Sequence, residues 1–149
     1  MNNVEKLQIV PRYNTLRTHN DTEREVYWCH MHADLASNPG RACFKPELID
    51  DILHFQQTLS DRMRLEQSRG THQLPHVVLS SDSDVFNLGG DLELFCRAIR
   101  NKDRNTLLGY ARQCVRGVHA FHTGLGVGAH SIALVQGDAL GGGFEAALS

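Results

Sequence analysis

Two short apolar runs, each followed by a glycine-rich turn and then by a helical pattern, constrain the fold of this chain most strongly. The first run is HVVLSS at 76–81, and FNLGGD follows it at 86–91. The second is SIALVQ at 131–136, and DALGGGFE follows it at 138–145. Helices that connect short buried strands indicate crossover connections, so this pattern predicts an α/β fold with a mainly parallel, buried sheet.

Other patterns predict the remaining elements. Two stretches rich in β-formers, 12–19 and 25–33, flank the turn-prone segment NDTER and predict a hairpin. Residues 46–66 begin with a proline and repeat apolar side chains at helical spacing, which predicts an amphipathic helix. Further helices are predicted after a cap at Asp91, over 103–122 with a cap at its first residue, and from FEAALS. The predicted apolar face of the 103–122 helix consists of Leu107, Ala111, Cys114, Val118 and Phe121.

Composition and charge exclude several classes of function. The formal net charge is -2, and Lys and Arg are interspersed with Asp and Glu, so nucleic-acid binding is not expected. Residues 1–14 lack a signal-peptide pattern, and no apolar run approaches the roughly 20 residues that cross a bilayer, so we expect a cytoplasmic protein without membrane insertion. Reduced thiols in half-buried positions are expected for the cysteines, which have no CxxC pair: Cys29, Cys43, Cys96 and Cys114.

Clusters that would carry other chemistry are incomplete. His30 and His32 alternate along one predicted strand, and His119 and His122 lie one helical turn apart, but neither pair completes a metal-ligand set. The serines within 80–83 lie outside any GxSxG sequence, so a serine hydrolase is not supported. The sequence therefore predicts no metal site and no cofactor.

The glycine turns themselves suit one kind of chemistry. A turn that opens a helix exposes backbone N–H groups, and glycine lets a ligand oxygen approach them closely. Two such turns side by side would stabilise the oxyanion that forms when a thioester carbonyl reacts, and losing one donor costs about 3–4 kcal/mol in the barrier. Glu145, three residues after Gly142, would place a general acid or base nearby. Alone, each turn also fits simple close packing, and Glu145 also fits a favourable helix-dipole partner.

These motifs resemble those of a known family. FNLGGDL resembles the first oxyanion motif of the crotonase (enoyl-CoA hydratase/isomerase) superfamily, and ALVQGDALGGGFEAALS closely resembles the second. The resemblance implies that Gly90 and Gly142 donate the two oxyanion N–H groups and that Glu145 is the first catalytic glutamate. It also implies a spiral of repeated ββα units, assembly as a homotrimer or larger, and no cofactor.

The N-terminal half narrows the resemblance to one subfamily. Residues 25–55 resemble the diffusible signal factor synthases of bacterial quorum sensing. Such enzymes dehydrate a 3-hydroxyacyl chain on acyl carrier protein to a cis-2-enoyl chain and then cleave the thioester to a free fatty acid. The matching residues are Tyr27, Trp28, Met31, Arg41, Cys43, Phe44, Pro46, Glu47 and Leu48.

The resemblance also sets an expectation about the extent of the chain. The family pattern places a second catalytic glutamate past Ser149, so residues 1–149 are expected to be the N-terminal portion of a single crotonase-like domain, truncated after the second oxyanion motif and inactive by itself. Two alternatives remain open. One is a general enoyl-CoA hydratase or isomerase that takes CoA thioesters, and the other is a non-catalytic module that binds the receiver domain of a sensor kinase.

Overall fold

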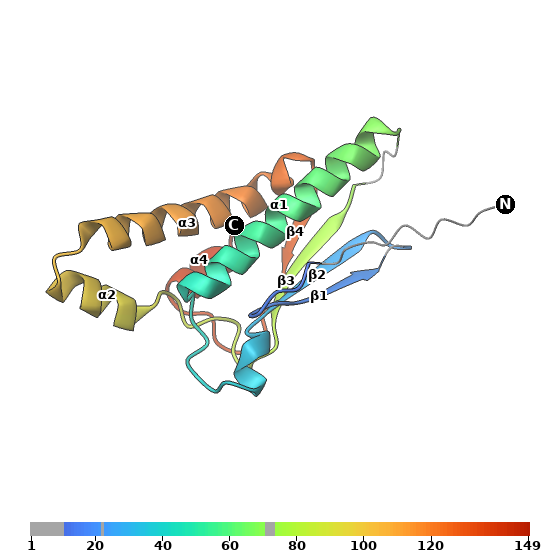
Figure 1. Ribbon diagram of the computed structural model, residues 1–149. Coiled ribbons are helices and arrows are strands. Elements are labelled where there is room, and N and C mark those ends of the chain that lie inside the picture. The colour runs from blue at the N-terminus through green and yellow to red at the C-terminus, as the bar shows by residue number, and fades with distance from the viewer. Residues whose placement is uncertain (1–10, 22, 71–73) are drawn as a thin grey trace.

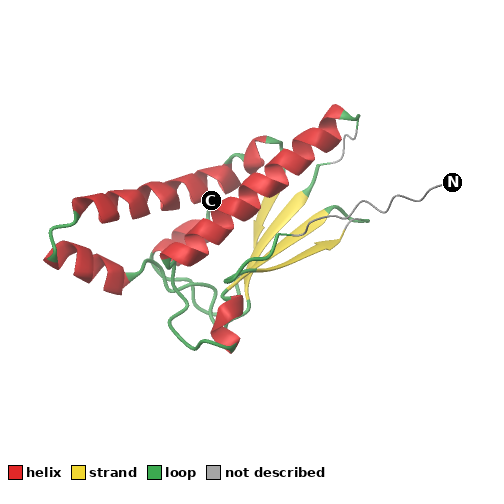
Figure 2. Cartoon of the chain, in the orientation of Figure 1, coloured by secondary structure: helices red, strands yellow, loops and turns green. Residues whose placement is uncertain are grey.

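The computed structural model describes residues 11–21, 23–70 and 74–149 as a sheet covered on one face by long helices (Figures 1 and 2). The α2 and α3 helices form a hairpin that extends away from the sheet (Figure 1). In chain order the elements are β1 (Arg17–Asp21), β2 (Val26–Met31), η1 (Ala33–Ala36), α1 (Pro46–Ser68), β3 (His76–Ser81), α2 (Leu92–Arg100), α3 (Arg104–His122), η2 (Gly124–Gly126), β4 (His130–Ala133) and α4 (Gly142–Ala147).

The sheet has the predicted mainly parallel topology. Its strand order is β1-β2-β3-β4, with β1 and β2 antiparallel and the other two pairings parallel. The α1 helix makes the crossover from β2 to β3, and the α2–α3 hairpin makes the crossover from β3 to β4. Crossovers of this kind pack helices back onto the sheet, as the apolar runs indicated.

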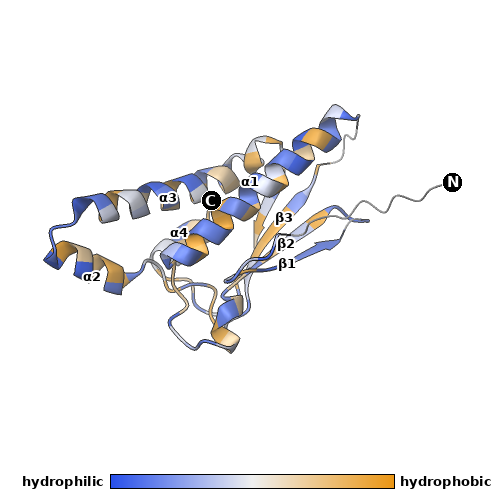
Figure 3. Cartoon of the chain, in the orientation of Figure 1, coloured by the Kyte–Doolittle hydropathy of each residue, from blue (hydrophilic) through white to orange (hydrophobic). Residues whose placement is uncertain are grey.

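Alternation along β2 positions the core against α1. Tyr27, Cys29 and Met31 are buried, whereas Trp28 and His30 point to the opposite face and are half-buried. Figure 3 shows α1 with separate hydrophobic and hydrophilic sides, as its sequence period predicts. The residues that α1 contributes to the main core are Leu48, Ile52, Phe55, Leu59 and Met63.

The predicted helix starts are confirmed by side-chain caps. The Asp91 carboxylate accepts a hydrogen bond from the Leu94 N–H at 3.0 Å, and the Asp103 carboxylate accepts one from the Thr106 N–H at 3.1 Å. Each cap satisfies one of the donors that a helix N-terminus leaves unpaired. No described helix is long and apolar enough to cross a membrane.

Three predicted strands have other bounds in the structure, and the one expected over 12–19 covers Arg17–Asp21. The strand expected over 131–136 ends at Ala133, because Phe86 and Asn87 draw the following chain toward them by donating to the Asp138 carbonyl. The strand expected over 25–33 ends at Met31, because His32 adopts a left-handed backbone conformation with φ 64°. Part of the predicted NDTER turn, residue 22, lies outside the described residues.

The predicted faces of α3 and the cysteines also need correction. Ala111 and Val118 are exposed, and Tyr110 belongs to the buried face together with Leu107 and Cys114, because this side of α3 packs against α1 and α2. All four cysteines are free thiols, as expected, but only Cys114 is half-buried. Cys29 and Cys43 are buried and Cys96 is exposed, since Cys29 lies on the core face of β2 and Cys96 on the outer face of α2.

Two glycines, one inside α3 and one just after its end, test this packing. Gly124 has φ +57°, and a Cβ there would overlap the Ala129 carbonyl, whereas a Cβ at Gly109 inside α3 would meet open space. We expect Gly124→Ala to lower the free energy of unfolding by about 2 kcal/mol or more. Gly109→Ala should raise it by about 0.5–1 kcal/mol. Urea unfolding followed by circular dichroism measures both, and equal effects of the two changes would contradict this description of the α3 end.

Candidate active site

The two glycine turns are joined by backbone pairing. A parallel bridge connects Asn87 with Ala139, and the Asn87 carbonyl accepts a hydrogen bond from the Leu140 N–H at 2.9 Å. A second parallel bridge connects Phe44 with Gly90. The first glycine turn is therefore held between the segment before α1 and the second glycine turn.

This pairing brings Gly90 and Gly142 together. A Cβ at Gly142 would lie 3.8 Å from the Gly90 nitrogen. The approach also requires glycine next in the chain, because a Cβ at Gly143 would overlap the Asn87 carbonyl oxygen. The residues that the sequence selects as oxyanion donors are thus neighbours in space.

Both candidate donors are available. Within the described residues, neither the Gly90 N–H nor the Gly142 N–H donates a hydrogen bond to the protein. Both residues are only partly buried, so the two N–H groups are not sealed in the core. A backbone N–H group that the protein leaves unpaired donates to water or to a ligand instead.

An apolar cavity of about 280 Å³ adjoins these N–H groups. This volume is slightly below the roughly 300–1,000 Å³ that is usual for small-molecule sites. Gly90 and Gly142 both line it, and α1, α2 and α3 supply most of its walls. Its other lining residues are Phe44, Ile49, Ile52, Leu79, Phe95, Tyr110, Gln113, Cys114, Gly117, Val118, Phe121, Glu145 and Ala146.

Glu145 lies in α4 and is exposed. It supplies the one carboxylate among the cavity-lining residues in the described part of the chain. Burial raises the pKa of the Tyr110 hydroxyl and of the Cys114 thiol, so both stay protonated near neutral pH. These three residues are the titratable groups that the described cavity offers.

Asn87, which the sequence reading did not select, organises the first glycine turn. Its side chain is fully buried, its Oδ1 accepts from the Gly89 N–H at 2.8 Å, and its Nδ2 lies 3.1 Å from Nε2 of His32. Because Oδ1 is engaged as an acceptor, Nδ2 must donate, and Nε2 of His32 must accept. An FNLGG sequence gives no sign of this partner, because His32 lies far away in the chain.

The charge state of His32 follows from this arrangement. Burial lowers its pKa to about 4, the nearby Asp34 raises it, and Lys45 lowers it again. A neutral imidazole can accept from Asn87, whereas an imidazolium cannot. In this structure His32 therefore serves as the acceptor that orients the Asn87 side chain.

Tyr110 connects α3 to the other side of the first glycine turn by hydrogen bonds. Its hydroxyl donates to the Phe44 carbonyl at 2.6 Å and accepts from the Asp91 N–H at 3.2 Å. The Phe95 ring packs edge-to-face on Tyr110 with ring centroids 5.0 Å apart. The sequence pattern did not identify Tyr110, because it placed the neighbouring Ala111 on the buried face of α3.

A second polar cluster on the opposite face of the sheet lacks the geometry of a catalytic triad. The Ser80 hydroxyl lies 2.6 Å from Nδ1 of His30, and Asp82 lies 3.6 Å from the same nitrogen. A relay needs the serine and the carboxylate on different ring nitrogens. No group of three or more potential metal ligands occurs among the residues that the structure describes.

The comparisons with known proteins agree on the fold. No family model and no curated protein matches the sequence. Among solved structures, Pseudomonas aeruginosa DspI matches with a TM-score of 0.69 and 17% identity over 96% of this chain and 50% of its own. Enoyl-CoA hydratases from Shewanella pealeana and Polaromonas match with TM-scores of 0.64 and 0.66, each at 18% identity over 89% of this chain.

The chain therefore has the crotonase fold, as the two glycine motifs predicted. It spans about half the length of the solved structures it matches, since it covers 43% and 44% of the two hydratases. At these identities the likeness establishes the arrangement of the elements, and the chemistry of the site has to be argued from its own residues.

The neutral state of His32 predicts a pH-dependent stability. Its folded pKa of about 4 lies below the ordinary 6.5, so between these values the unfolded chain binds a proton that the folded chain does not. The free energy of unfolding should fall from pH 6.5 to pH 4, with His32 contributing about 3 kcal/mol at most.

The His32→Asn variant tests this prediction, because asparagine tolerates the left-handed backbone and does not titrate. Burial also lowers the pKa of His30, so a smaller slope from that residue will remain in both proteins. Denaturant unfolding at several pH values should give a flatter pH dependence for His32→Asn. Parallel curves for variant and parent would show that His32 is not the group responsible.

Proposed function

We propose that this chain carries half of the active site of an acyl-thioester dehydratase that also acts as a thioesterase and produces a cis-2-unsaturated fatty acid signal. The substrate is a 3-hydroxyacyl chain bound as a thioester to acyl carrier protein. The observation that carries the proposal is the pair of unbonded N–H groups on Gly90 and Gly142 beside an apolar cavity. The sequence resemblance of residues 25–55 to diffusible signal factor synthases supplies the choice of reaction.

The two N–H groups would bind the thioester carbonyl oxygen. As the α-proton leaves, negative charge moves onto this oxygen, and fixed donors stabilise it more strongly than they stabilise the ground state. The apolar walls formed by Phe44, Phe95 and Val118 suit the hydrocarbon part of the substrate. Acyl chain and carbonyl would then occupy adjoining parts of one cavity.

Glu145 is proposed to handle one of the two protons of the dehydration. One group removes the proton from the α-carbon, another protonates the 3-hydroxyl, and water leaves as the double bond forms. Tyr110 and Cys114 hold their protons near neutral pH, so neither serves as the base, and the Tyr110 hydroxyl already donates its hydrogen to the Phe44 carbonyl. We propose that the second carboxylate comes from polypeptide outside these 149 residues and that the chain alone binds substrate without turning it over.

The enoyl-CoA hydratases among the similar structures support a second candidate, the hydration or isomerisation of CoA thioesters. The same pair of N–H groups would serve that chemistry. The two candidates differ in the carrier and in the released product. Turnover of 3-hydroxyacyl carrier protein to free cis-2-enoic acid supports the first, and preference for the CoA ester with no release of free acid supports the second.

Glu145→Gln tests the proton-transfer role. In the polypeptide as its gene encodes it, the change should lower the dehydration rate by about 10²–10⁴-fold, because the amide cannot exchange a proton at this position. Glu93→Gln is the matched control, since Glu93 is exposed in α2 and does not line the cavity. Mass spectrometry of the products measures both rates, and a folded Glu145→Gln enzyme with near-normal turnover would exclude the role.

Gly90 allows the backbone donor to be tested directly. Gly90→Pro removes the N–H, whereas Gly90→Ala keeps it, although the added Cβ would lie 2.8 Å from the Phe95 ring and force that side chain to move. We expect the proline variant to lose about 10²–10³-fold in kcat, and the alanine variant to lose much less. Binding of a substrate analogue to both variants is the control, and equal kcat values for proline and alanine would remove Gly90 from the oxyanion site.

A further inference from the structure

The α2–α3 hairpin, residues 92–122, has a charge opposite to that of the whole chain. It contains six Lys and Arg residues and two Asp and Glu residues, whereas the chain has a net charge of -2. All six cations are exposed. They are Arg97, Arg100, Lys102, Arg104, Arg112 and Arg116.

These six cations are also unpaired. Every ion pair found among the described residues lies elsewhere, in or next to β1, β2, β3 or α1, such as Arg62 with Glu66. Of the two hairpin carboxylates, Asp103 is engaged as the cap of α3. The hairpin thus presents positive charge that no described carboxylate neutralises through an ion pair.

Apolar side chains lie exposed among these cations. Ile99 and Val115 are 64% and 67% exposed, and Leu92 is also exposed at the start of α2. A protein partner can bury such side chains while its carboxylates pair with the arginines. A polyphosphate would neutralise the charge and leave the apolar side chains in water.

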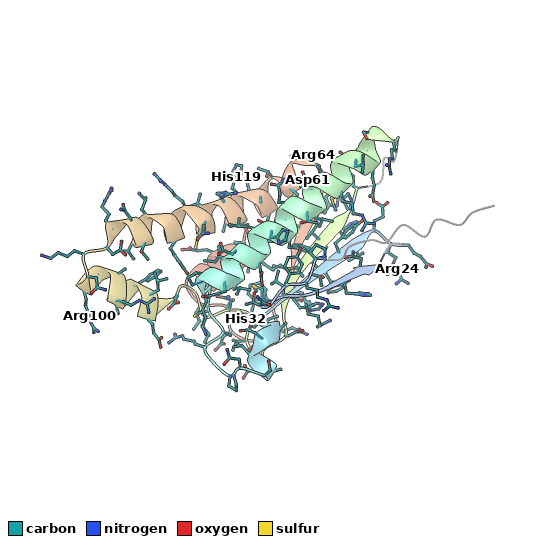
Figure 4. All side chains as sticks on the ribbon, viewed as in Figure 1. Arg24, His32, Asp61, Arg64, Arg100 and His119 are labelled. Carbon is teal, nitrogen blue, oxygen red and sulfur yellow. The ribbon has the colours of Figure 1, made fainter. Side chains whose placement is uncertain are left out.

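The hairpin is also a wall of the proposed active site. Phe95 from α2 and Tyr110 and Val118 from α3 line the cavity beside Gly90. Figure 4 places Arg100 at the far end of the hairpin, away from the sheet end where Arg24 lies. A partner that binds along the length of the hairpin would therefore contact the helices that form this wall of the cavity.

We propose that the exposed face of the α2–α3 hairpin docks an acidic carrier protein that delivers the acyl chain to the adjoining cavity. The choice of a carrier that holds a thioester rests on the proposed function. The surface itself rests on the unpaired cations and the exposed apolar side chains. Docking by complementary charge raises the rate of encounter and falls with ionic strength.

Charge reversal at the tip of the hairpin tests the proposal. The double variant Arg100→Glu/Arg104→Glu is compared with Arg12→Glu/Arg24→Glu, whose two arginines are exposed outside the hairpin. Binding of the 149-residue chain to a bacterial acyl carrier protein is measured by surface plasmon resonance, with the carrier either unacylated or holding a 3-hydroxydecanoyl amide. Thermal unfolding checks that each variant folds, and Arg100→Gln/Arg104→Gln replaces the reversal pair if that pair unfolds.

The hairpin reversal should weaken binding of both carrier forms by about tenfold or more, mainly through slower association, and the control reversal should leave it within about twofold. Raised salt should weaken carrier binding by the parent chain and by the control variant more than it weakens binding by the hairpin variant. Equal binding by all three proteins, or binding of 3-hydroxydecanoyl-CoA but of no carrier, overturns the docking surface. A different result would count against the proposed function alone. In that result the hairpin reversal weakens binding of the carrier, but the acyl group adds no affinity to it.

Discussion

The hydrogen bonds of Asn87 are the interactions on which the rest of the site depends. Its backbone carbonyl holds the second glycine turn through Leu140, and its side chain holds the first turn through the Gly89 N–H. One fully buried residue thus fixes two loops that belong to different crossovers. Buried polar groups that satisfy one another in this way position a backbone more exactingly than apolar contacts do. The spacing between Gly90 and Gly142 follows from it.

The groups around Asn87 keep the same charge states near neutral pH, so its hydrogen bonds do not change there. His32 is kept neutral by burial, so its acceptor nitrogen remains available to Asn87. Tyr110 keeps its proton and ties the Phe44 carbonyl to the same region. None of these supporting groups changes charge around pH 7. Among the titratable groups that line the described cavity, Glu145 is the one to which proton transfer is proposed.

The sequence predicted those features that depend on local pattern. The crossover topology, the caps at Asp91 and Asp103 and the two glycine turns could be read from apolar runs, capping residues and glycine pairs. Strand ends and the partners of Asn87 could not, because they depend on contacts between distant segments. The excess of cations in residues 92–122 can be counted in the sequence, but the exposure of all six on one hairpin is seen only in the structure. The family resemblance predicted the fold, and the assigned roles of Gly90 and Glu145 remain predictions.

The bridges that build the site have a consequence for how the protein folds. Phe44 pairs with Gly90, and Asn87 pairs with Ala139, so each bridge closes a loop that contains a complete crossover helix. Contacts between such distant segments form only when those loops close, and closing them costs conformational entropy. Helices α1 and α3 can form locally before the glycine turns meet. Gly90 and Gly142 would then come together in the last steps of folding, so the candidate site can exist only in molecules whose β3 and β4 strands have already paired.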